Sequence, residues 1–136
     1  METLTIVNDI PVLCLKAPVF PNDVSATHDQ LHALISDSKS RQFFGISHPN
    51  KSGEIIYKAA IEQKTENEAK FFNLESFTIP KGNYAFIDLI DYYKNIPNVG
   101  ITFKKLIALP NINPNGFCLE WYLTSRDVRC MVKLND

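Results

Sequence analysis

The chain has 136 residues, of which 45% are hydrophobic and 21% are charged, and its formal net charge is −1. This length and composition predict one soluble globular domain over residues 1–136. The 14 Lys and Arg residues are scattered along the sequence rather than collected into a stripe. We therefore expect no binding to nucleic acid by this chain alone.

The sequence contains no signal for export or for a membrane span. Acidic residues and a proline stand in the first fifteen positions, where a leader would have a basic segment and then a long apolar one. The three cysteines, Cys14, Cys118 and Cys130, are odd in number and lack Cys-x-x-Cys spacing. This argues against a disulfide framework and a structural zinc site. We expect a cytoplasmic protein that has no membrane contact and no cofactor.

The first half of the chain carries the signals of a strand, a helix and a β-hairpin. An apolar run predicts a strand at about residues 11–17. Apolar residues at helical spacing predict an amphipathic helix over about residues 23–38. Segments 41–48 and 54–63 are typical of strands and are joined by a turn rich in polar residues, which predicts a hairpin. The polar segment 64–70 is expected to be an exposed linker.

In the second half of the chain, the predicted helix is again preceded by strand signals and followed by two strands. A strand is predicted across residues 77–78 and another over residues 84–90, separated by a Pro-Lys-Gly turn. Helical spacing follows over residues 99–107 and ends before a proline. Two further strands are predicted, one within residues 114–124 and the last over residues 128–134.

The matching order of elements indicates an internal duplication with halves at about residues 1–65 and 71–136. When the two halves are aligned on their hairpins, Ile46 corresponds to Glu120. We expect an α+β fold of two β-α-β-β repeats related by a pseudo-twofold axis, with antiparallel sheets and two main helices. Such an arrangement leaves a central ligand cleft between the halves.

Glu120 lies in the middle of an otherwise apolar predicted strand. Alternation along the strand places Glu120 and Tyr122 on one face and Trp121 on the other, where we expect Trp121 to pack under a helix. A carboxylate is costly to bury without a partner. Glu120 therefore either lines a cavity or lies at a sheet edge, where it would limit aggregation or pair with Lys133 or Lys58. The residues alone leave both interpretations open.

Three parts of the sequence make the chain resemble the GyrI-like small-molecule-binding domain, the effector-binding module of bacterial multidrug-responsive activators. They are segments 44–47 and 57–60, the Ile-Pro-Lys-Gly-Asn-Tyr segment at 79–84, and segment 115–122, which contains Glu-x-Tyr. The resemblance implies a duplicated β-α-β-β fold with an aromatic groove and an acidic residue, which by position is Glu120. The family's regulators add a helix-turn-helix region before this domain, so we expect the free-standing form here.

The expected function is the binding of small lipophilic compounds, including cationic ones. A carboxylate attracts an organic cation by charge, and each aromatic ring face adds cation–π attraction of roughly 0.5–2 kcal/mol. His28 and His32 share one helix face but lack a third ligand, so no metal site is expected. The candidate ligand-binding residues are Glu120, Tyr122, Tyr84, Tyr57, Phe86 and Phe44.

Two alternatives stay open. A desolvated glutamate with a raised pKa beside a tyrosine could act as general acid or base in a hydrolase of electrophilic compounds, as some relatives of the family are reported to do. A regulatory protein could instead act through a protein partner, as inhibitor members of the family do. The sequence has no Gly-x-Ser-x-Gly motif and no phosphate-binding loop, which favours a protein that is not an enzyme.

Overall fold

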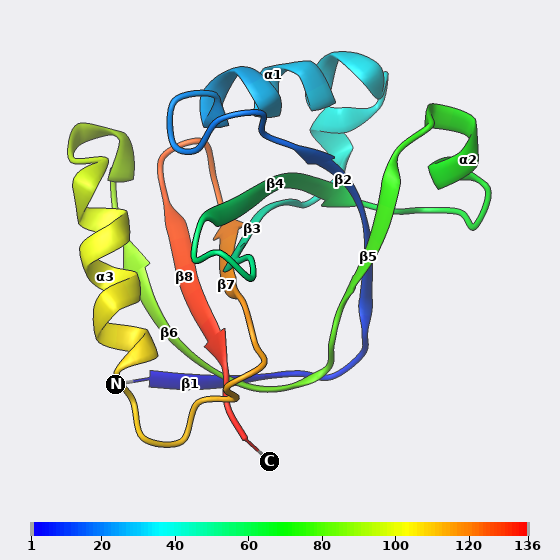
Figure 1. Ribbon diagram of the computed structural model, residues 1–136. Coiled ribbons are helices and arrows are strands. Elements are labelled where there is room, and N and C mark those ends of the chain that lie inside the picture. Colours follow the sequence, from blue (N-terminus) through cyan, green and yellow to red (C-terminus); the bar gives the residue numbers. More distant parts are fainter. Residues whose placement is uncertain (1, 136) are drawn as a thin grey trace.

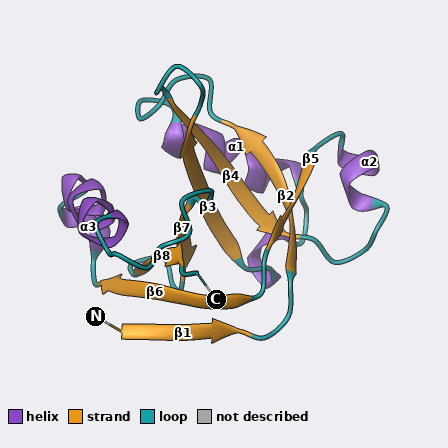
Figure 2. Ribbon diagram, turned by 60° about the horizontal axis from the view of Figure 1, so that its bottom comes forward, coloured by secondary structure: helices purple, strands orange, loops and turns teal. Residues whose placement is uncertain are grey.

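The computed structural model describes residues 2–135, and its central element is a curled antiparallel sheet of eight strands (Figures 1 and 2). The strands are β1 (Glu2–Ile6), β2 (Ile10–Lys16), β3 (Phe43–Pro49), β4 (Ile55–Glu62), β5 (Glu75–Ile79), β6 (Gly82–Leu89), β7 (Cys118–Tyr122) and β8 (Val128–Lys133). The helices are α1 (Val24–Leu34), α2 (Glu68–Phe72) and α3 (Pro97–Ile107), with short 3-10 turns η1 (Ser38–Ser40) and η2 (Tyr92–Lys94). The predicted α+β fold class is confirmed.

The strand order is symmetric about its centre. It runs β1-β6-β8-β7-β3-β4-β2-β5, so β1 to β4 occupy the same places from one edge as β5 to β8 occupy from the other. Strands β3 and β7 pair in the middle of the sheet, and each edge strand pairs with a strand from the other half of the chain. This symmetry agrees with a pseudo-twofold axis, while an internal duplication of the sequence stays a prediction.

The central ladder changes the expected correspondence between the halves. It pairs residues 43–47 of β3 with residues 122–118 of β7, and its middle pair is Gly45 and Glu120. A twofold axis through that pair exchanges these two residues, so Gly45 rather than Ile46 is the counterpart of Glu120. The predicted alignment was one residue out of register, which in a strand moves a side chain to the opposite face.

Helices α1 and α3 lie outside the curl of the sheet (Figure 1). Leu31 and Ile35, at the end of α1, pack on a buried cluster of β2 and β4 residues. Phe103 and Leu106 of α3 pack on buried residues of β6 and β8. The inside of the curl bears no helix among the described residues and is filled by apolar side chains of the sheet itself, including Phe44, Tyr84, Leu119 and Met131.

Trp121 was expected to pack under a helix, and this expectation was wrong. Its side chain packs inside the curl, with its ring centroid 5.5 Å from that of Phe44, and its indole N–H donates to Gln42 Oε1 at 3.0 Å. The alternation along β7 was correct. The helices cover the face that bears Glu120, and sequence alternation alone cannot say which face a helix covers.

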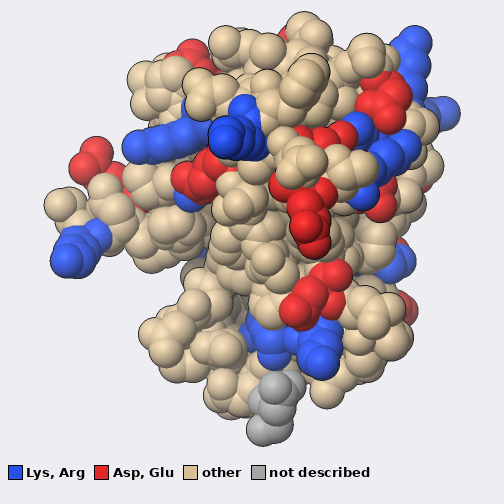
Figure 3. Space-filling view, turned by 90° about the vertical axis from the view of Figure 1, so that its right-hand side faces the viewer, with Lys and Arg blue, Asp and Glu red and all other residues tan. Residues whose placement is uncertain are grey.

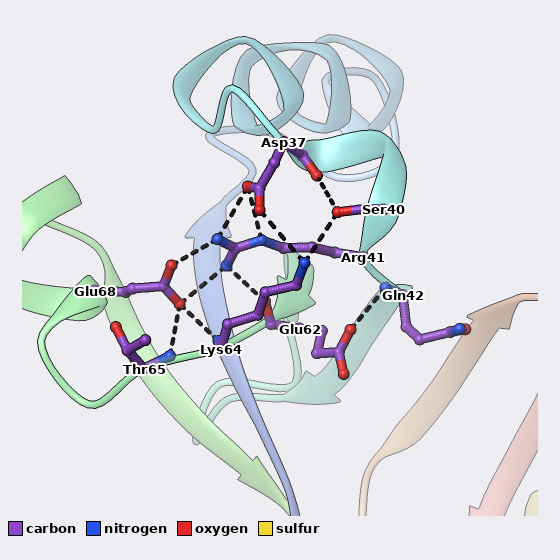
Figure 4. Close-up of polar contacts among 8 residues, drawn as sticks. All are labelled: Asp37, Ser40, Arg41, Gln42, Glu62, Lys64, Thr65 and Glu68. Atoms are coloured by element: carbon purple, nitrogen blue, oxygen red, sulfur yellow. Dashed lines mark hydrogen bonds and ion pairs between the residues drawn. The ribbon is translucent and has the colours of Figure 1, made fainter.

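Strand β1 and helix α2 were not predicted, and α2 begins inside the segment expected to be a linker. A partly buried ion pair holds α2 in place (Figure 4). The Arg41 guanidinium, whose side chain is 4% exposed, donates to both carboxylate oxygens of Glu68 at 2.9 and 2.6 Å and also contacts Asp37. The same hydrogen bonds lower the pKa of Glu68 to about 2. A contact between residues 27 positions apart leaves no local sequence signal.

The side of the molecule formed by β2, β5 and α2 carries acidic and basic side chains interspersed, with no stripe of one sign (Figure 3). Several of them are paired, as Lys58 is with Glu75. Within residues 2–135 no helix is long and apolar enough to cross a membrane. A cytoplasmic location stays a prediction.

Candidate functional site

A cleft of about 830 Å³ opens on the face of the sheet that bears the helices. Helix α1 forms one wall with His28, Asp29 and His32, and the η2 segment forms another with Tyr92 and Tyr93. The rim is completed by Phe43 at the start of β3 and by Tyr122 with the loop that follows β7, residues 123–125. The cleft therefore lies between the first helix and the segment that leads into the third, over the end of the central strand pair.

Glu120 lies beneath this cleft, in a strand that has neighbours on both sides. Its Oε1 atom accepts hydrogen bonds from Tyr122 Oη at 2.5 Å and Tyr57 Oη at 2.7 Å. Lys58 pairs with Glu75 instead, and the ion pairs found among residues 2–135 do not include Glu120. The interpretation of Glu120 as a charge that guards a sheet edge is therefore excluded.

His28 extends this hydrogen-bonded group to the cleft wall. Its Nε2 atom lies 2.8 Å from Tyr57 Oη. With the Tyr57 hydroxyl donating to Glu120, His28 Nε2 is the donor to Tyr57 Oη, which in a neutral imidazole corresponds to the tautomer protonated at Nε2. The ring of His28 also meets the Tyr122 ring edge to face, with centroids 5.2 Å apart. Two residues on separate elements thus hold each phenol in place.

Burial shifts the pKa of every ionisable member of this group. It raises the pKa of the Glu120 carboxyl, and the hydrogen bonds from Tyr122 and Tyr57 partly oppose that rise. Burial and then the Glu120 charge raise the pKa of both Tyr57 and Tyr122 well above 10. Burial lowers the pKa of His28 to about 4. At neutral pH the imidazole and both phenols are uncharged, so any charge within the group resides on Glu120.

The structure brings together three of the six predicted site residues, Glu120, Tyr122 and Tyr57. Tyr122 lines the cleft directly, and Glu120 and Tyr57 lie one hydrogen bond behind Tyr122 and His28. Their hydrogen-bonded arrangement can accept a proton, donate one or attract a cation. A role of these residues in binding a ligand stays a prediction.

The structure does not bring Phe44, Tyr84 and Phe86 to this cleft. All three lie in the buried cluster inside the curl, on the opposite face of the sheet. Tyr84 Oη donates to the Pro80 carbonyl at 2.6 Å, and the Arg129 guanidinium lies 4.4 Å from the centre of the Phe86 ring. These residues were chosen from sequence motifs, and the face to which each one points depends on strand register.

Sequence reasoning missed most of the aromatic cleft wall. Tyr92 approaches Tyr122 with ring centroids 5.7 Å apart, and His32 stacks on Phe43 at 4.0 Å. The adjacent tyrosines at 92 and 93, in a segment between a strand and a helix, were the available signal. The spacing of His28 and His32 had been considered for a metal, and no group of three potential metal ligands occurs within residues 2–135.

No family model matches the sequence, and no curated protein matches it significantly. Solved structures share its fold. The structure of SAV2435 bound to tetraphenylphosphonium is 11% identical, with a TM-score of 0.66, and the match covers 97% of this chain and 93% of that one. Integron cassette protein VCH_CASS2 from the mobile metagenome of Vibrio cholerae is 10% identical, with a TM-score of 0.67 and coverage of 98% and 95%.

A hydrolase from Listeria innocua also shares the fold, at 10% identity and a TM-score of 0.65, with coverage of 98% of this chain and 90% of that one. At these identities the likeness establishes the fold alone. SAV2435, which has this fold, binds a small molecule in its solved structure. Membership of the GyrI-like family stays a prediction.

Proposed function

We propose that this protein binds small lipophilic cations in the cleft between α1 and η2, with Glu120 as the group that attracts their charge. One observation carries the proposal. Glu120 is a carboxylate beneath an aromatic-walled cleft, in a central strand, and the ion pairs found among residues 2–135 do not include it. A buried carboxylate without a cationic partner is rare in a protein that does not use it.

The energetics favour a cation over a neutral ligand. Removing Glu120 from water disfavours its charged form, and the two phenol hydrogen bonds offset only part of that penalty. A positive ligand in the cleft would supply the missing counter-charge. His28 cannot do so at neutral pH, because its pKa is about 4.

The cleft walls suit a lipophilic cation. Tyr92 and Tyr122 present aromatic rings, each of which adds cation–π attraction of roughly 0.5–2 kcal/mol. The volume of about 830 Å³ lies within the usual range of small-molecule sites, about 300–1,000 Å³. The fold shared with a protein that binds tetraphenylphosphonium supports the same ligand class.

Calorimetric titration with tetraphenylphosphonium tests the proposal. For a charge pair about 8 Å apart and an effective dielectric constant of about 20, the attraction is about 2 kcal/mol. Glu120→Gln should therefore weaken cation binding by about 30-fold and leave the binding of triphenylphosphine oxide, a neutral analogue, unchanged. Asp29→Asn is the matched control, because Asp29 lines the cleft but is exposed and its charge is screened. Equal cation affinity in wild type and Glu120→Gln would remove Glu120 from the mechanism.

A second candidate function is hydrolysis of an electrophilic small molecule, with Glu120 as general acid or base. The short Tyr122–Glu120 hydrogen bond of 2.5 Å and the raised pKa of the carboxyl favour it, and a hydrolase shares the fold. Product release from an epoxide-type substrate, lost in Glu120→Gln while binding persists, would favour hydrolysis over simple binding. Action through a protein partner stays a prediction.

A further inference from the structure

Gly45 occupies the middle of β3, at the centre of the sheet, where it pairs with both Glu120 and Ala59. A glycine at such a position weakens a strand, because it has no side chain to pack and it gains more freedom than other residues on unfolding. Its backbone does not require glycine, since the glycines with positive φ are Gly53 and Gly82. The reason for glycine at position 45 must lie in the space beside it.

That space is filled by the hydrogen bond beneath the cleft. A Cβ atom at position 45 would collide with Tyr57 Oη and Glu120 Oε1 and would lie 2.9 Å from Tyr57 Cζ, closer than real Cβ contacts come. The two oxygens are the atoms joined by the 2.7 Å hydrogen bond between Tyr57 and Glu120. With a methyl group present, either the phenol or the carboxylate must move away.

We propose that Gly45 is a positioning residue, whose missing side chain leaves the space in which Tyr57 and Glu120 form their hydrogen bond beneath the cleft. The inference deepens the proposed function and rests on it where cation binding is concerned. It also explains why the counterpart of Glu120 across the central ladder is the smallest residue. A side chain at position 45 would occupy the same space as the Glu120 carboxylate and the Tyr57 hydroxyl. With glycine there, these two groups fill that space.

The test measures Gly45→Ala in two backgrounds. In the wild-type chain we expect a lower Tm and weaker tetraphenylphosphonium binding. In the Tyr57→Phe/Glu120→Ala chain, which lacks both colliding oxygens and keeps only the contact with Cζ of residue 57, the same substitution should lower the Tm by much less. Gly100→Ala is the matched control, because Gly100 is exposed on α3 and a Cβ there meets nothing within 4 Å. It should change the Tm equally in both backgrounds.

Failure of Gly45→Ala to fold in the wild-type background, with folding restored in the other, also supports the inference. An equal loss of Tm in the two backgrounds, or failure to fold in both, would overturn it, since the cost would then be unrelated to the two oxygens. Unchanged Tm and unchanged cation binding in the wild-type background would overturn it as well. If the wild-type chain binds no cation, the proposed function fails, yet the comparison of Tm values still decides the role of Gly45.

Discussion

The partly buried imidazole of His28 predicts a specific loss of stability in mild acid. The pKa of His28 is lowered from 6.5 to about 4, first because burial removes water from the charged form. Below pH 6.5 the unfolded chain binds a proton at this residue, whereas the folded chain does so only near pH 4. The stabilisation is therefore fully present above pH 6.5 and is lost as the pH falls toward 4. The difference corresponds to at most about 3 kcal/mol of unfolding free energy.

His28→Gln removes the titrating group and keeps an amide that can donate to Tyr57 Oη. Urea unfolding of both chains at a series of pH values between 4 and 8 gives the free energy of unfolding. We expect the wild-type value to converge on that of the variant, or to fall below it, as the pH is lowered. Glu120, with its raised pKa, acts in the opposite direction in acid, but it is present in both chains and cancels in their difference.

His48→Gln is the control variant, because it removes an imidazole that lies outside the cleft, near the end of β3 at the hairpin with β4. Parallel pH curves for wild type and His28→Gln would refute the reasoning. They would mean that His28 takes up its proton at the same pH in the folded and unfolded chains, and that it is not the neutral hydrogen-bond donor to Tyr57.

Two further predictions concern the framework of the cleft. Arg41→Met should lower the free energy of unfolding by about 1.5–3 kcal/mol in denaturant titration, because it removes the charge-assisted hydrogen bonds to the partly buried Glu68 carboxylate, and adding Glu68→Gln should restore part of the loss; a loss below about 1 kcal/mol would mean that the pair is effectively solvated. Leu106→Ala should lower the free energy of unfolding by about 2–5 kcal/mol, because Leu106 is fully buried between α3 and the sheet. Ile101 lies on the same helix but is exposed, so Ile101→Ala should change the free energy of unfolding little. Equal effects of these two alanine substitutions would contradict the packing of α3 on the sheet.

The sequence was sufficient for the local features of this protein. Hydrophobic period predicted the long strands and both long helices, since the spacing of apolar residues follows directly from local backbone geometry. Alternation also placed Glu120 and Tyr122 on one face of β7. The two short elements that it missed, β1 and α2, have five residues each and are held by contacts with distant segments.

Only the tertiary structure decided what surrounds Glu120. Tyr57 is 63 positions from Glu120, and His28 is 29 positions from Tyr57, so neither contact has a local signal. Strand register decided that Phe44 points inside the curl while its neighbour Gly45 lies against the carboxylate. The physical reason is that local spacing fixes which residues of one strand share a face, whereas long-range pairing fixes which face bears the helices and which side chains meet there.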